Sequence, residues 1–115
     1  MGYIVNHTIS VTSSNETALR SARDFAASTG AGVSEIVTGM VNGSASFVVV
    51  PDGSKEGWEE SDLGDKRREQ IKLWLRARAY SDGSTPFKWF EVEHPEDGAP
   101  RVIDHQNKRV RTPNL

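Results

Sequence analysis

The sequence predicts an α+β domain of the ferredoxin-like type, a split βαβ arrangement in which an antiparallel sheet carries two helices on one face. The main observation is the order of segments along the chain: β, α, β, β, α, β and a weak fifth strand. The chain has 115 residues, enough for one hydrophobic core and too few for two. It contains no cysteine, so no disulfide framework can replace that core.

The N-terminal segment is expected to form a strand followed by a helix. Apolar and polar residues alternate from Tyr3 to Thr12, which is typical of a strand with one buried face. Ser13-Ser14-Asn15 then offers side chains that cap helix N-termini, and apolar residues recur at helical spacing until Gly30. The sequence therefore predicts a helix from Glu16 to Thr29.

Two β-rich segments follow this helix and are expected to pair as a hairpin. They run from Val33 to Val41 and from Ala45 to Val50. Between them lies Asn42-Gly43, a dipeptide that tolerates the positive φ angles of a type I′ turn. We expect a two-residue turn at this dipeptide. The next segment, residues 51–60, contains proline, glycines and charged residues, and is expected to be a loop.

The longest amphipathic segment runs from Ser61 to Tyr80 and predicts the main helix. An apolar stripe at helical spacing is expected to face the core: Ile71, Trp74, Leu75 and Ala79. The charged residues between them are expected to face water: Lys66, Arg68, Glu69, Lys72 and Arg76. Acidic residues near its N-terminus favour a helix start there, and Ser81-Asp82-Gly83 is expected to end the helix.

An aromatic-rich segment from Pro86 to Glu93 predicts the next strand. Because successive side chains of a strand point to opposite faces, two neighbouring aromatic residues must lie on opposite faces of the sheet. We expect Phe90 and Val92 to face the core and Trp89 to lie on the other side.

The C-terminal part is expected to contribute a turn, a short strand and a tail. His94 to Pro100 contains two prolines and Asp97-Gly98, which indicates a turn, and Arg101 to His105 predicts a fifth strand. We expect residues 1–105 to form a single α+β domain and residues 106–115 to form a frayed basic tail.

Two right-handed crossovers would place the first and third strands in the centre of the sheet. Nine residues are then expected in the core: Val5, Ile9, Phe25, Phe47, Val49, Ile71, Leu75, Phe90 and Val92. The other face of the sheet stays open, because no further segment supplies a third layer. The alternative fold is a βαββ unit followed by an αββ unit whose last hairpin wraps one edge.

The composition limits the classes of partner. The chain has 14 Lys and Arg against 16 Asp and Glu, a net charge of −2, so no overall field attracts nucleic acid or an acidic membrane. Neither a signal peptide nor a run of about 18 apolar residues is present in the sequence. Together with the lack of cysteine, this predicts a cytoplasmic protein with no membrane partner.

The ionisable residues form no recognised catalytic or metal-binding pattern. His7, His94 and His105 are far apart, and none has the spacing of a zinc ligand. His7 falls on the buried face of the first strand, where we favour a hydrogen-bonded core or rim histidine over a catalytic one. Asp104 and His105 are adjacent in a strand and would point to opposite faces. We therefore expect no catalytic residue, metal site or cofactor.

Two groups of acidic residues keep a small metal-dependent hydrolase as a third possibility. The first group precedes the main helix, where the helix dipole explains acidic residues: Glu56, Glu59, Glu60, Asp62 and Asp65. The second group surrounds His94: Glu91, Glu93, Glu96 and Asp97.

Nucleic-acid binding is the second hypothesis, and it depends on two groups of basic residues. One lies on the main helix between Lys66 and Arg78, and the other is the tail with Lys108, Arg109 and Arg111. Acidic residues are interleaved with them, and the first strand offers no aromatic residue to the open face. We expect weak nucleic-acid binding at most.

One stretch is similar to a pattern in small uncharacterised proteins of phage and prophage genomes. The stretch consists of GWEESDLGD, a helix containing IKLWL, and AYSDGSTPFKWFEVEHPEDG, and it covers roughly residues 57–98. The resemblance implies no activity, cofactor or site residue. It implies only a class of compact accessory proteins that often bind a host or viral protein.

We therefore predict a non-catalytic binding protein of phage type that acts through its open sheet face or the loop at 51–60. The host cytoplasm would then be its location. The candidate binding residues are Trp58, Glu59, Glu60, Trp89, Lys108, Arg109 and Arg111. An exposed sheet face or edge strand could also pair two copies as a homodimer.

Trp58 has two interpretations, because all its close neighbours are charged residues or glycine. It is expected either to cover one end of the core as a buried plug beside Leu63, which is the favoured interpretation, or to stand exposed as an anchor for a partner.

Overall fold

The elements follow the predicted order along the chain. The computed structural model describes residues 4–39, 43–53 and 57–107 of the 115 residues. Within these residues the elements are β1 (Val5–Ser13), α1 (Glu16–Ser28), β2 (Val37–Thr38), β3 (Ala45–Val49), α2 (Glu59–Ala77), β4 (Lys88–Pro95) and β5 (Arg101–His105).

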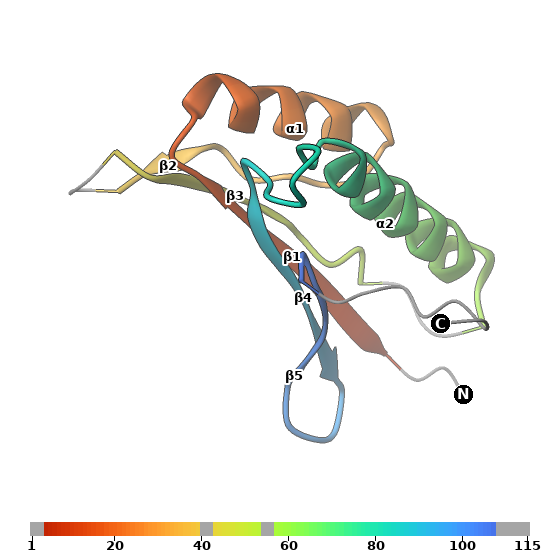
Figure 1. Ribbon diagram of the computed structural model, residues 1–115. Coiled ribbons are helices and arrows are strands. Elements are labelled where there is room, and N and C mark those ends of the chain that lie inside the picture. The colour runs from red at the N-terminus through yellow and green to blue at the C-terminus, as the bar shows by residue number, and fades with distance from the viewer. Residues whose placement is uncertain (1–3, 40–42, 54–56, 108–115) are drawn as a thin grey trace, which may run out of the picture.

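The strands form one antiparallel sheet in the order β2-β3-β1-β4-β5, and both helices lie on one face of it (Figure 1). The predicted α+β class is therefore confirmed. The first and third strands lie inside the sheet, as predicted, and β5 extends the sheet beyond β4. In the described part of the chain, no helix lies on the opposite face of the sheet (Figure 1).

α1 begins where the sequence predicts because Asn15 caps it. The side-chain oxygen of Asn15 accepts a hydrogen bond from the Ala18 backbone N–H at 3.1 Å. The helix then buries its apolar face against the sheet through Leu19, Ala22 and Ala26. It ends at Ser28, one residue before the predicted end.

β2 is much shorter than the predicted strand from Val33 to Val41. Only Val37–Thr38 pairs as a strand with β3, and Val33 forms an isolated bridge. The reason lies at Ser34, whose hydroxyl accepts the Val48 N–H at 2.8 Å in place of a backbone carbonyl. A side-chain hydrogen bond thus replaces one of the backbone hydrogen bonds that a longer β2 would make with β3.

The predicted two-residue turn at Asn42-Gly43 does not match the strand register. Such a turn would pair Val41 with Ser44, but Thr38 pairs with Ala45, a register shifted by two residues. Asn42 lies outside the described residues. Gly43 has a φ of 66°, which favours glycine, so the positive φ predicted for this residue is present.

The core lies between the sheet and the two helices. Of the nine residues predicted for it, five are at most 2% exposed: Ile9, Phe47, Val49, Ile71 and Leu75. Val5 and Phe25 are partly buried. The predictions for Phe90 and Val92 are wrong. Phe90 is 43% exposed, and Val92, which pairs with Thr8 of β1, lies with Phe90 on the sheet face away from the helices.

β4 presents the opposite face to the one predicted. Trp89 and Phe87 are each 1% exposed, and Phe87 lies below α2 with its ring 5.9 Å from that of Trp74. Strand alternation then places Phe90 on the open face. β4 also continues through His94 to Pro95, which the sequence predicted to be a turn, because β1 pairs with it over this length.

α2 begins two residues before the predicted Ser61 and ends three residues before Tyr80. Ile71 and Leu75 are buried as predicted, whereas Ala79 lies beyond the helix end and is exposed. The placement of Lys72 on the surface is wrong, since Lys72 is 6% exposed.

The predicted tail starts one residue too early. The side chain of Gln106 accepts the Trp89 backbone N–H at 2.8 Å, and the Gln106 N–H donates to the Trp89 carbonyl at 3.3 Å. Gln106 is therefore attached to the sheet. Residues 108–115, which include Lys108, Arg109 and Arg111, lie outside the described residues.

Candidate functional site

An exposed apolar surface lies at the N-terminus of α2. Its centre is Trp58, which is 49% exposed, with Leu63 beside it at 44%. Together with four neighbours these side chains line a hollow of about 450 Å³. We call this the Trp58 surface, and it consists of Asp52, Gly53, Trp58, Glu60, Leu63 and Arg67.

Trp58 occupies the N-cap position of α2 but makes no capping hydrogen bond through its side chain. Ser, Thr, Asp or Asn usually occupies this position, because a side-chain oxygen can accept a free N–H of the first turn. Asn15 does so in α1. Local helix chemistry therefore does not account for tryptophan at position 58.

Acidic side chains surround Trp58. Glu59 and Glu60 are the first two residues of α2, Asp62 follows within the first turn, and all three are exposed. They interact favourably with the positive end of the helix dipole. Two of the predicted binding residues, Glu59 and Glu60, thus lie next to the third, Trp58. The favoured interpretation of Trp58 as a buried plug is wrong, because half of the side chain is accessible.

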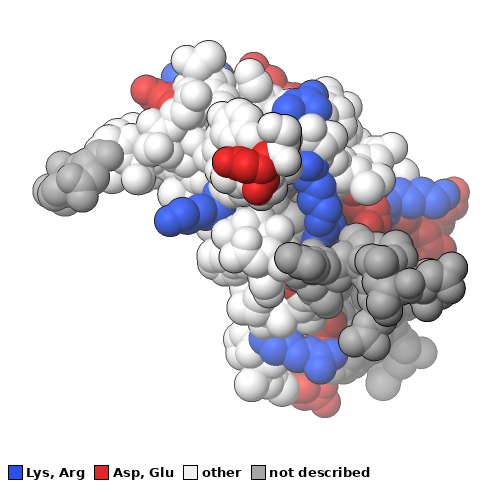
Figure 2. All heavy atoms as spheres, in the orientation of Figure 1, with Lys and Arg blue, Asp and Glu red and all other residues white. Residues whose placement is uncertain are grey.

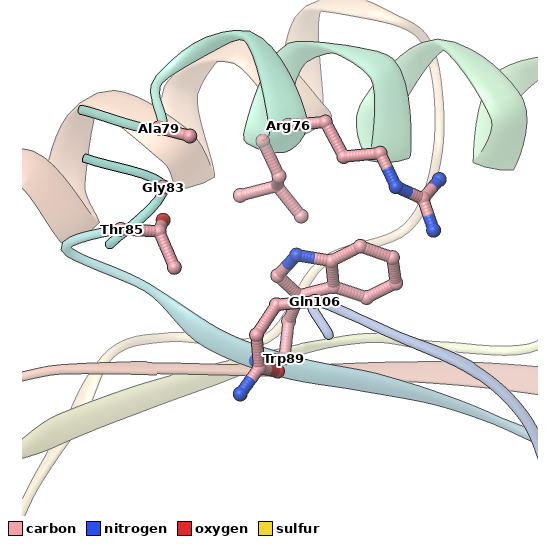
Figure 3. A pocket seen from close by; sticks show the side chains of 7 residues that line it. Arg76, Ala79, Gly83, Thr85, Trp89 and Gln106 are labelled. Carbon is pink, nitrogen blue, oxygen red and sulfur yellow. The ribbon is translucent and has the colours of Figure 1, made fainter. Parts of the chain in front are cut away.

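Trp89, the fourth predicted binding residue within the described part of the chain, lies elsewhere and is buried. Its indole instead forms part of a small pocket of about 160 Å³ at the end of α2 (Figure 3). The Arg76 guanidinium lies 4.8 Å from the centre of the Trp89 ring and donates a hydrogen bond to Asp104. This cation therefore has partners inside the protein already.

A cluster of ionisable side chains between α2 and the sheet was missed by the sequence analysis. Its centre is Lys72, whose ammonium lies 2.8 Å from Glu91 and 3.0 Å from Asp104. Glu91 also accepts a hydrogen bond from His7 at 3.1 Å. We call this the charged cluster, and it consists of His7, Arg68, Lys72, Arg76, Glu91 and Asp104.

The charges of this cluster are paired with one another inside the protein. The side chains of Glu91 and Lys72 are 3% and 7% exposed. Isolated charges at such positions would be very unfavourable, and pairing with hydrogen bonds offsets that cost. His7 takes part as a hydrogen-bonded histidine of the core rim, which is the interpretation that its position in the first strand favoured.

The pKa values of the cluster reflect this pairing. Burial alone would lower the pKa of Lys72, but hydrogen bonds to Glu91, Glu69 and Asp104 raise it above its ordinary value. Burial alone would raise the pKa of Glu91, but hydrogen bonds from His7 and Lys72 hold it below the ordinary value. The pKa of Asp104 is lowered in the same way, against burial, by Lys72 and Arg76. The carboxylates therefore stay ionised as acceptors.

The charged cluster also changes the interpretation of the basic residues on α2. Lys72, Arg76 and Arg68 pair with carboxylates of the sheet, and Arg78 lies over the Trp74 ring at 4.0 Å. On the face shown in Figure 2, acidic and basic side chains are interspersed. α2 thus presents little of the basic surface that the nucleic-acid hypothesis requires, and that hypothesis now depends on residues 108–111.

No group of three or more His, Asp or Glu residues within the described ranges is arranged to hold a metal ion. Neither of the two helices that the structure describes is long and apolar enough to cross a membrane. Comparisons with protein-family models, curated protein sequences and solved structures find no match to this chain.

Proposed function

We propose that the chain is a non-catalytic binding protein and that the Trp58 surface is where it holds a protein partner. The observation that carries this proposal is a half-exposed tryptophan at a helix N-cap, where it makes no capping bond. A large aromatic side chain that stays half exposed at a helix N-cap departs from the local rule of helix capping, and such departures are typical of functional sites.

The composition of the Trp58 surface supports protein binding. Tryptophan is the residue most often found at the energetic centre of protein interfaces, because it offers a large rigid apolar area. Leu63 widens the apolar centre, and the acidic residues around it form a polar rim. The hollow can accept one apolar side chain of a partner.

The charge of the rim indicates the chemistry of that partner. Asp52 and Glu60 line the hollow together with Arg67, and Glu59 and Asp62 belong to the same acidic first turn of α2. Complementary charge favours encounter with a partner of opposite sign and disfavours acidic ones. We infer a partner that presents an apolar side chain flanked by lysine or arginine.

Two finer features belong to the same proposal. The first four strands run in the order 2-3-1-4, with each neighbouring pair antiparallel, which supports a ferredoxin-like arrangement extended by β5. The similarity of residues 57–98 to small phage and prophage proteins supports a role as an accessory protein that binds a host or viral protein. Four of the six residues of the Trp58 surface lie within this stretch: Trp58, Glu60, Leu63 and Arg67.

The proposal is tested by affinity capture from a bacterial lysate with three immobilised proteins: wild type, Trp58→Ser and Tyr80→Ser. Tyr80 is a matched control, because it is an aromatic residue that is 58% exposed outside the Trp58 surface. We expect wild type and Tyr80→Ser to retain the same partner, and Trp58→Ser to bind it at least about thirtyfold more weakly. Equal retention by Trp58→Ser would contradict the proposed surface.

A further inference from the structure

The sheet face away from the helices, which we call the open sheet face, has an apolar centre. β4 contributes Phe90 and Val92, and Val102 of β5 lies directly opposite Val92. Phe90 is 43% exposed and Val102 is 57% exposed. Val48 of β3 lies on the same face, because Val48 and Phe90 both pair with Ser10 of β1. The apolar side chains thus come from three strands, β3, β4 and β5, with Ser10 of β1 between Val48 and Phe90.

Short polar side chains surround this centre, and several are already paired within the sheet. Thr8 bonds with His94 at 2.9 Å, and Thr12 bonds with Ser46 at 2.6 Å. A surface that packs on them would therefore leave few hydroxyl groups without a hydrogen-bond partner.

The open sheet face also carries almost no charge. Among its described strand residues, Lys88 is the only one with a full charge at neutral pH, although 26% of all residues in the chain are charged. The strand carboxylates Glu91 and Asp104 point to the other side, where Lys72 binds them. Nothing on the described face would select a strongly charged partner or a phosphate backbone.

We propose that a second copy of the chain packs on the open sheet face and forms a two-fold dimer with Phe90 at its centre. A surface that meets its own copy places identical charges close together, so a nearly neutral face suits this arrangement. The dimer goes beyond the proposed function. It leaves the Trp58 surface accessible, because α2 lies on the other side of the sheet (Figure 1).

The size of the face suits a weak dimer. Its four longer strands have five to nine residues each. With strands about 4.8 Å apart and about 3.4 Å per residue, the flat area is on the order of 450 Å². Two such faces approach the roughly 1,000 Å² that specific interfaces need. We therefore expect a dissociation constant of about 1–100 µM.

Sedimentation velocity of the full chain from about 1 to 300 µM tests the proposal, a range chosen to bracket that constant. We expect the mass to rise with concentration toward twice the chain mass of 12.7 kDa. Phe90→Lys and, independently, Val102→Lys should each weaken the dimer at least about tenfold, because two copies would then bring extra lysines together. Circular dichroism of each variant verifies that the chain is folded.

Leu73→Lys is the matched control, since Leu73 is 62% exposed on α2, on the helix side of the sheet. It should dimerise like the wild type. A wild-type chain that stays monomeric over the whole range would overturn the proposal. So would a dimer that tolerates both Phe90→Lys and Val102→Lys, or one that Leu73→Lys disrupts instead. None of these three results depends on whether the Trp58 surface binds a partner.

Discussion

Lys72 is the residue that bridges the two carboxylates of the charged cluster. Replacing it by alanine would leave Glu91, whose side chain is 3% exposed, without its nearest cation, whereas Asp104 would keep its ion pair with Arg76. Removing one partner of a buried ion pair typically costs about 3–5 kcal/mol. We expect Lys72→Ala to lower the free energy of unfolding by about this amount, measured by urea denaturation.

Lys66→Ala is the control for this prediction, because Lys66 lies on the exposed side of the same helix. It should change the free energy of unfolding by less than about 0.5 kcal/mol. Equal effects of the two substitutions would show that the charged cluster adds nothing to stability.

The two neighbouring aromatic residues of β4 should differ strongly in their contribution to stability. Trp89 is 1% exposed and Phe90 is 43% exposed. Trp89→Ala should cost about 3–5 kcal/mol through lost burial and a cavity, whereas Phe90→Ala should cost about 1 kcal/mol or less. Urea denaturation at low protein concentration, where the chain is monomeric, measures both. The reverse order would mean that β4 faces the other way.

The phase of β4 could not be predicted from local sequence. Alternation shows that Trp89 and Phe90 point to opposite faces of the sheet. It does not show which of them points to the core, because each face receives one aromatic side chain. The buried face also includes Glu91, which a sequence pattern places in water. Its burial depends on Lys72 and His7, which come from other elements of the fold. The alternation of side chains along β4 was therefore predictable from the sequence, but which of its two faces is buried was not.

At the scale of elements, predictions succeeded where the determining interactions are local. α1 begins at Glu16 because its cap, Asn15, is the preceding residue. Its C-terminus is followed by Gly30 at a φ of 93°, a conformation that other residues resist. β2 was predicted too long because the hydrogen bond of Ser34 with the distant Val48 replaces part of the ladder.

Gly30 is expected to be required for two reasons, its positive φ and its contact with Arg67. A methyl group on Gly30 would lie 3.0 Å from the Arg67 guanidinium. Gly53 also has a positive φ of 74° but nothing within 4 Å of such a methyl group. We expect Gly30→Ala to cost on the order of 1 kcal/mol or more and Gly53→Ala to cost less. Thermal unfolding of both variants measures the difference, and equal losses would exclude a role for the Arg67 contact.

At the scale of the whole molecule, the lowered pKa values of Glu91 and Asp104 predict that acid destabilises the fold. Their ordinary values are about 4, so the unfolded chain takes up protons first as the pH falls. The stability that these carboxylates contribute is present above about pH 5 and is lost as the pH falls through the lower folded-state pKa values.

Glu91→Gln tests this pH dependence, because it keeps the shape of the side chain and removes its charge. Urea denaturation at several pH values between about 7 and 3 should show a less stable variant at neutral pH and a flatter decline than in the wild type. Parallel declines would mean that other carboxylates cause the acid sensitivity.

The candidate site was predictable in one part and not in the other. The Trp58 surface is formed largely by residues close in sequence, so a tryptophan among acidic residues and glycine already indicated it. The charged cluster combines side chains from β1, α2, β4 and β5, and only the fold brings them together. Its residues looked like an ordinary mixture of surface charges in the sequence.

The unfolding free energy of Trp58→Ser is the most direct test of the claim that Trp58 serves binding and not stability. Serine can supply the missing cap bond of α2, a gain of about 1 kcal/mol that offsets the loss of a half-exposed side chain. Urea denaturation should therefore give a free energy of unfolding within about 1 kcal/mol of the wild type. A loss of more than about 2 kcal/mol would place Trp58 among the structural aromatic residues and contradict the claim.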